Sequence, residues 1–146
     1  MYGPNPIKCP YPEMTDDIEP GILPLVTALN STGLVHTFSS CEGHFGPDEQ
    51  RLRDRNHAEV RFLPASSAST PGTLPDHWLG TLLTRFKIHH GLMPVTVIGY
   101  KLFTPTGEAT IDETYVIELR PFNRFDPPAA KRADIDRAVR QLAGLV

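Results

Sequence analysis

Apolar residues recur at helical spacing in three separate segments of the chain. In residues 22–29, 79–86 and 135–142 they occupy positions i, i+3, i+4 and i+7, which lie on one face of a helix. Gly33 and Gly91 follow the first two segments, where a glycine commonly ends a helix in the left-handed conformation. The pattern therefore predicts three helices, each with one buried side.

Between these segments the pattern changes to the two-residue alternation of strands. It predicts strands over residues 34–39, 58–63, 95–103 and 114–120, with a protruding loop over residues 104–113. The element order is α-β-β-α-β-β-α, and strands in two consecutive pairs favour antiparallel pairing. We therefore expect a two-layer α+β domain, in which three helices cover one face of a four-stranded, mainly antiparallel sheet.

The length of 146 residues is enough for one domain with a hydrophobic core. Residues 1–17 are rich in proline and predict an N-terminal arm, which leaves residues 18–146 as the single α+β domain. No apolar run is long enough to cross a bilayer, and the first residues lack the order of a secretory signal. We expect a soluble, cytoplasmic protein without a membrane partner.

The charge distribution bears on the choice of partner. The net charge is −3; residues 1–73 hold five Lys/Arg and nine Asp/Glu, so they carry −4, and residues 74–146 hold nine and eight, so they carry +1. Neither half has the strongly basic character that drives nonspecific nucleic-acid binding. Nucleic acid stays open as a partner but is not favoured, and a small-molecule ligand is the preferred expectation. The sequence does not indicate an oligomeric state.

The chemistry-bearing residues are concentrated in Ser39-Ser40-Cys41-Glu42-Gly43-His44, directly after the first predicted strand. Two hydroxyls, a thiol, a carboxylate and an imidazole lie there within six positions, and ligand-binding residues commonly lie on loops that a rigid scaffold positions. Gly43 permits a sharp turn. The segment predicts a ligand-binding or metal-binding site. The alternatives are a polar turn around a buried cysteine and a noncatalytic binding or regulatory module.

Zinc binding is one form of this site. Cys41 and His44 have Cys-x-x-His spacing, which can bring sulfur and nitrogen to one ion. Further ligands could come from three other residues: His36, His57 or Cys9. Three protein ligands leave a position for water, and Glu42 could then act as the general base. This hypothesis predicts metal-assisted hydrolytic or transfer chemistry.

Thiol chemistry is a second form of the site. Cys41 could act as a nucleophile if His44 or His57 removed its proton or lowered its pKa. A buried, unreactive cysteine is the competing interpretation.

Residues 25–30, 37–44 and 58–62 together resemble the opening of the wybutosine-synthesis methyltransferase family. That family has a helix ending in Leu-Asn, a strand, and a Ser-Ser-Cys-Ser-Gly-Arg loop, and the resemblance covers about a quarter of the chain. It implies S-adenosylmethionine as cofactor and methylation of a modified guanosine in tRNA.

Within the loop, four positions match the family pattern: Ser39, Ser40, Cys41 and Gly43. The resemblance implies that the loop lines the site, with Ser39, Ser40 and Gly43 as cofactor-binding residues. Glu42 replaces a serine and His44 replaces the arginine. Loss of the arginine removes a bidentate donor for phosphate or carboxylate, so the resemblance is also compatible with shared architecture and a changed activity.

Overall fold

The computed structural model describes residues 18–46, 56–65, 74–91 and 94–146 of the chain. The predicted N-terminal arm, residues 1–17, lies outside the described residues.

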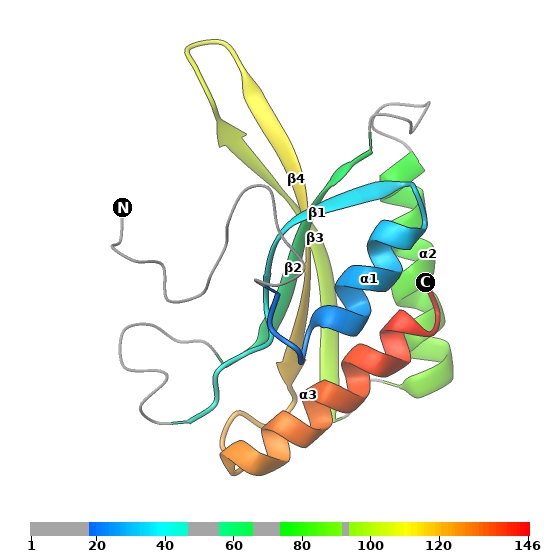
Figure 1. Ribbon diagram of the computed structural model, residues 1–146, viewed down its shortest axis with the longest axis vertical. Helices are drawn as coiled ribbons and strands as arrows, with labels where there is room; N and C mark the ends of the chain where they lie inside the picture. Colours follow the sequence, from blue (N-terminus) through cyan, green and yellow to red (C-terminus); the bar gives the residue numbers. More distant parts are fainter. Residues whose placement is uncertain (1–17, 47–55, 66–73, 92–93) are drawn as a thin grey trace.

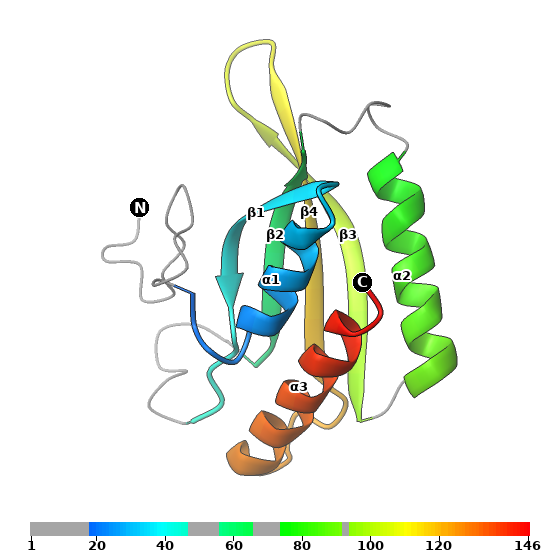
Figure 2. The same cartoon turned by 45° about the vertical axis from the view of Figure 1, so that its right-hand side comes forward.

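The described residues form three helices and four strands in the predicted order (Figure 1). The elements are α1 (Leu23–Ser31), β1 (Val35–Cys41), β2 (Ala58–Pro64), α2 (Leu74–His90), β3 (Val95–Pro105), β4 (Ile111–Pro121) and α3 (Pro128–Ala143). The strands form one sheet in the order β1-β2-β4-β3, and each neighbouring pair is antiparallel. All three helices lie on the same side of this sheet (Figure 2), which confirms the α+β fold.

The helices end where the glycines predict. Gly33 and Gly91 both have a φ of 74°, in the left-handed region, and they follow α1 and α2 closely. None of the helices in the described part of the chain combines the length and the apolar character needed to cross a membrane.

The connection between β3 and β4 is shorter than predicted. Pairing continues as far as Pro105 and Ile111, and the Thr106 N–H donates to the Thr110 carbonyl oxygen at 3.0 Å. The predicted loop over residues 104–113 is therefore wrong, because both strands extend into it. The resulting long hairpin projects beyond the helical layer (Figure 1).

The core lies between the sheet and the helices. Phe62 is fully buried there, stacked on Tyr115 with ring centroids 5.5 Å apart and in edge contact with Trp78 at 6.2 Å. The predicted inward positions of β4 and α3 are buried as expected: Tyr115, Ile117, Leu119, Ile135, Ala138, Val139 and Leu142.

A β-bulge in β1 changes which face its side chains occupy. The register against β2 shifts between Thr37 and Ser39, so Phe38 is the additional residue. Before the bulge, Thr37 faces the helices and its Oγ1 accepts a hydrogen bond from Asn30 of α1 at 2.9 Å. After the bulge, Ser39 and Cys41 lie on the opposite face of the sheet. In a strand without a bulge, residues 37, 39 and 41 would all lie on the same face.

We call this second face the distal face. Ser39, Cys41, Glu59, Arg61, Glu118 and Arg120 belong to it, as the register of β1, β2 and β4 shows. It carries the candidate chemistry.

Candidate metal centre

Three potential metal ligands converge at the end of β1. Ligand atoms of Glu19, Cys41 and His44 all lie within 4.8 Å of one another. Oε2 of Glu19 is 3.3 Å from Nε2 of His44. Cys41 is buried, whereas the side chains of Glu19 and His44 are 20% and 18% exposed. The group thus offers oxygen, sulfur and nitrogen to one ion, with Cys41 and Nε2 of His44 buried.

Reciprocal hydrogen bonds hold Glu19 against the loop. The Glu42 N–H donates to Oε1 of Glu19 at 2.9 Å, and the Gly21 N–H donates to Oε1 of Glu42 at 2.7 Å. A Cβ at Gly21 would lie 2.6 Å from that Glu42 oxygen, so a side chain there would displace the Glu42 carboxylate. Oε2 of Glu19 faces His44, which fixes the carboxylate toward the metal-ligand group.

Arg132 of α3 holds the loop from the other side. Its Nη1 donates to the Gly43 carbonyl oxygen at 3.0 Å and its Nη2 to that of Glu42 at 2.7 Å. Nε donates to Asp136 at 2.9 Å, and the guanidinium lies 5.1 Å from the centroid of the Phe45 ring. The C-terminal helix therefore positions the backbone between Cys41 and His44.

Gly43 makes the turn that the sequence predicts. Its φ is 91°, and a Cβ there would approach Cζ of Phe45 to 2.7 Å and the His57 carbonyl oxygen to 3.2 Å. Both the conformation and the space require glycine. The contact also brings the loop next to the residue that precedes β2.

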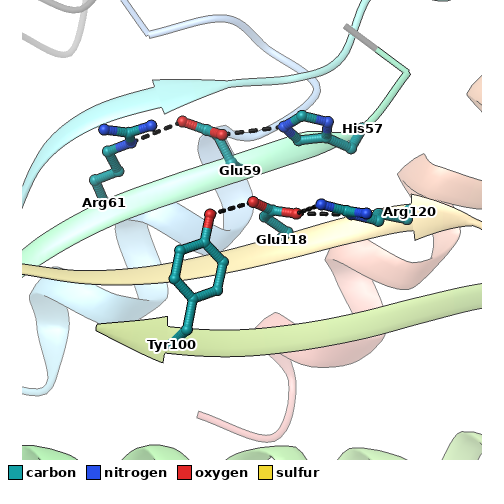
Figure 3. Close-up of polar contacts among 6 residues, drawn as sticks. All are labelled: His57, Glu59, Arg61, Tyr100, Glu118 and Arg120. Carbon is teal, nitrogen blue, oxygen red and sulfur yellow. Dashed lines mark hydrogen bonds and ion pairs between the residues drawn. The ribbon is translucent and has the colours of Figure 1, made fainter. Parts of the chain in front are cut away.

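A second group of potential ligands occupies the adjoining part of the distal face (Figure 3). Ligand atoms of His57, Glu59 and Glu118 lie within 4.8 Å of one another. Glu59 and Glu118 are direct partners between β2 and β4, and their side chains are only 9% and 6% exposed. Two neighbouring buried carboxylates require compensating charge.

His57 and Arg61 compensate Glu59. Nε2 of His57 lies 3.1 Å from Oε1, and Nε of Arg61 donates to Oε2 at 2.9 Å. Burial alone would raise the pKa of Glu59, but the hydrogen bond with His57 and the charge and hydrogen bond of Arg61 outweigh it and lower the pKa to about 2. Glu59 is therefore a carboxylate at neutral pH.

Arg120 and Tyr100 compensate Glu118. Nε of Arg120 donates to Oε1 at 2.7 Å, and the Tyr100 hydroxyl donates to Oε2 (Figure 3). Burial, together with the hydrogen bond to Glu118 and the charge of that carboxylate, raises the pKa of Tyr100 to about 12. Tyr100 thus stays protonated and remains a donor.

The structure brings only some of the predicted metal and catalytic residues together. Cys41 and His44 share one group, as the Cys-x-x-His spacing predicts. His57 belongs to the second group, His36 is exposed nearer the start of β1, and Cys9 lies outside the described residues. The Glu42 carboxylate turns away toward Gly21 and lines a separate surface pocket of about 300 Å³. Its role as general base stays a prediction, one that this geometry does not favour.

The residues that the family resemblance assigns to a cofactor lie on different surfaces. Ser39 and Ser40 are both buried, but Ser39 pairs with Arg61 on the distal face and Ser40 with Val60 of the core. Gly43 lies beyond them in the turn. The three residues do not line one surface, and binding of S-adenosylmethionine stays a prediction.

Sequence reasoning missed three candidate ligands: Glu19, Glu59 and Glu118. Glu19 precedes α1 by four positions and carries no motif of its own. Alternation along β4 places Glu118 on the face away from the core, but its pairing with Glu59 follows from the β2–β4 neighbourhood. A charged residue inside each of two predicted strands was the available signal.

Comparison of the chain with protein-family models, with curated proteins and with solved structures gives no match.

Proposed function

We propose that the protein binds a zinc ion through Glu19, Cys41 and His44 and uses it in hydrolytic or group-transfer chemistry. The observation that carries the proposal is the convergence of these three ligand atoms within 4.8 Å. Carboxylate oxygen, thiolate sulfur and imidazole nitrogen are the three donor types that zinc prefers. One carboxylate and one thiolate also balance the charge of a divalent ion.

Three protein ligands suit a catalytic site better than a closed structural one. Zinc with three protein ligands keeps a fourth position for water or substrate, and it lowers the pKa of bound water toward neutrality. Cys41 and the Nε2 atom of His44 are buried, and the Glu19 side chain, which is 20% exposed, forms the more accessible side of the group. The Glu42 N–H donates to Glu19, so this ligand would be oriented before the ion binds.

Metal content tests the binding step. The purified protein, dialysed against zinc in buffer without chelator, is expected to retain zinc, and elemental analysis measures it. Cys41→Ser and His44→Ala are each expected to weaken zinc affinity at least tenfold, because each removes a ligand. His89→Ala is the matched control, since His89 is an exposed helix residue. Wild-type protein that retains no zinc would refute the proposal.

Thermal unfolding gives an independent readout. A ligand present at about 100 times its Kd stabilises the native state by about 2.7 kcal/mol, which for a chain of this size raises Tm by several degrees. We expect this shift in wild-type protein and in His89→Ala, and a much smaller shift in Cys41→Ser.

The chemical step is tested with activated esters and phosphoesters as probes. We expect hydrolysis that depends on added zinc and is lost in His44→Ala. Zinc binding without zinc-dependent turnover of any probe would leave a binding protein and contradict the hydrolytic part of the proposal.

A further inference from the structure

We infer that His57, Glu59 and Glu118 bind a second divalent transition-metal ion, beside the proposed zinc site. The inference goes beyond the proposed function, because none of these three residues takes part in it. One imidazole nitrogen and two carboxylate oxygens within 4.8 Å of one another form a donor set suited to zinc or manganese.

The two groups are neighbours on the distal face. Glu59 pairs with Cys41 on one side and with Glu118 on the other, so these residues form one row across β1, β2 and β4. Paired residues of antiparallel strands have Cα atoms about 4.5–5.5 Å apart. Enzymes that hold two neighbouring metal ions use them to stabilise both the attacking and the leaving oxygen of a displacement. The row provides the framework for such a pair.

The two carboxylate oxygens of Glu59 have different partners. His57 approaches Oε1, whereas Arg61 binds Oε2, so imidazole and guanidinium use different oxygens. The contact between His57 and Glu59 shares one proton. A metal ion between them would replace that proton and keep the bond from Arg61.

Glu118 can contribute in the same way. Arg120 binds Oε1 and Tyr100 binds Oε2 (Figure 3), but each carboxylate oxygen has two lone-pair directions. The arginine and tyrosine would then orient the ligating carboxylate, as outer partners of metal ligands commonly do. Their side chains lie along the strands on either side of the row.

Charge predicts which site is stronger. At Glu19, Cys41 and His44 a carboxylate and a thiolate neutralise the ion, whereas at the second site Arg61 and Arg120 already compensate the two carboxylates. We therefore expect the second ion to bind at least tenfold more weakly than the first.

Cobalt titration of the metal-free full-length protein distinguishes the two sites. Equilibrium dialysis with elemental analysis counts the bound ions, and the titration uses the Cys9→Ser background, in which thiolate-to-cobalt absorption reports binding at Cys41 alone. We expect saturation at two equivalents, with the thiolate absorption complete after the first. The same count is expected with zinc.

Single substitutions assign the second equivalent. His57→Ala and Glu118→Gln are each expected to saturate at one equivalent with full thiolate absorption. His77→Ala and Glu113→Gln are the matched controls, since both residues are exposed, and they should keep two equivalents. Circular dichroism checks that each variant folds. If Glu118→Gln unfolds, His57→Ala alone tests the inference, since the His57 side chain is 21% exposed and its loss is better tolerated.

The outcomes separate this inference from the proposed function. Wild-type saturation at one equivalent with thiolate absorption, or variants that keep two, overturns the second site and leaves the first. If the wild-type protein saturates at one equivalent, shows no thiolate absorption and loses that equivalent in His57→Ala, the second site is supported and the first is refuted. No bound ion at any concentration below a millimolar overturns both.

Discussion

The two faces of the sheet are made by the same strands but are built differently. On the helical face, β2 and β4 present Val60, Phe62, Ile117 and Leu119, all fully buried and apolar. On the distal face, the alternating residues of the same strands are Glu59, Arg61, Val116, Glu118 and Arg120, and all of them except Val116 are charged. Glu59 and Glu118 are almost as buried as the core, although they are charged.

The helical face therefore stabilises the fold, and the distal face carries the candidate ligands. Burial of apolar side chains stabilises the fold, whereas a buried ion-pair network gives little net stability because its desolvation cost offsets the attraction. A fold whose apolar face already holds it together can carry such a network on the other face, and Cys41 joins that face through the bulge at Phe38.

The largest expected effect lies on the helical face. Phe62→Ala should lower the free energy of unfolding by about 3–5 kcal/mol, because it removes a fully buried ring packed against Tyr115 and Trp78. Urea denaturation measures it, and zinc affinity of the folded fraction should be unchanged. Phe103→Ala, at a ring that is 63% exposed, is the control and should change the free energy by less than about 0.5 kcal/mol. Equal losses in the two variants would contradict the location of the core.

The loop contact of Arg132 should affect metal binding more than stability. Arg132→Met removes the donors to the Glu42 and Gly43 carbonyl oxygens and is expected to weaken zinc affinity about 10- to 100-fold, the usual cost of losing an outer partner of a metal site. Arg137→Met is the matched control on the same helix, since Arg137 pairs with Asp134 instead. Competition with a chromophoric chelator measures affinity; a loss in unfolding free energy with unchanged affinity would make Arg132 purely structural.

A smaller effect is expected within the distal network. Tyr100→Phe removes the hydroxyl that donates to Glu118 and should cost about 1.5 kcal/mol, the lower end of the range for a hydrogen bond to a charged group, because the contact is only partly buried. Chemical denaturation of the metal-free protein gives the value. A cost near zero would show that this contact does not stabilise the buried carboxylate.

The smallest effect concerns the helical side, where Asp76 of α2 accepts a hydrogen bond from Tyr115 and lies 3.0 Å from Nζ of Lys101. The bond from Tyr115, followed by that from Lys101, lowers the pKa of Asp76. Since the folded pKa lies below the unfolded value of about 3.9, the stabilisation is present above that pH and is lost as the pH falls through the folded pKa.

Asp76→Asn should therefore lower the free energy of unfolding at pH 7, by less than about 1 kcal/mol because the carboxylate is 44% exposed. The difference from wild type should shrink below about pH 4. Denaturation curves at both pH values measure it. A difference that grows in acid would have the wrong sign for this account.

The fold can be predicted from the sequence because the patterns that indicate its helices and strands are local. Helical spacing, strand alternation and the glycines at 33 and 91 each act over a few residues, and the structure confirms them. The extension of β3 and β4 into residues 104–113 was missed because these residues are all exposed and lack the apolar contrast that marks a strand with one buried face.

The candidate site can be predicted from the sequence only in part, because the contacts that complete it join residues far apart in the chain. Cys41 and His44 are three positions apart and could be linked, but Glu19 reaches them through hydrogen bonds between segments more than twenty residues apart. The bulge at Phe38 depends on pairing with β2, and alternation read along β1 alone cannot reveal it. Without strand order, Glu59 and Glu118 look like two separate exposed charges.

X-ray absorption at the zinc edge, on Cys9→Ser protein loaded with one equivalent of zinc, tests the central claim most directly. The account predicts one sulfur at about 2.3 Å, from Cys41, with nitrogen and oxygen donors at about 2.0–2.2 Å. A first coordination shell without sulfur, or an unchanged spectrum after Cys41→Ser, would contradict it.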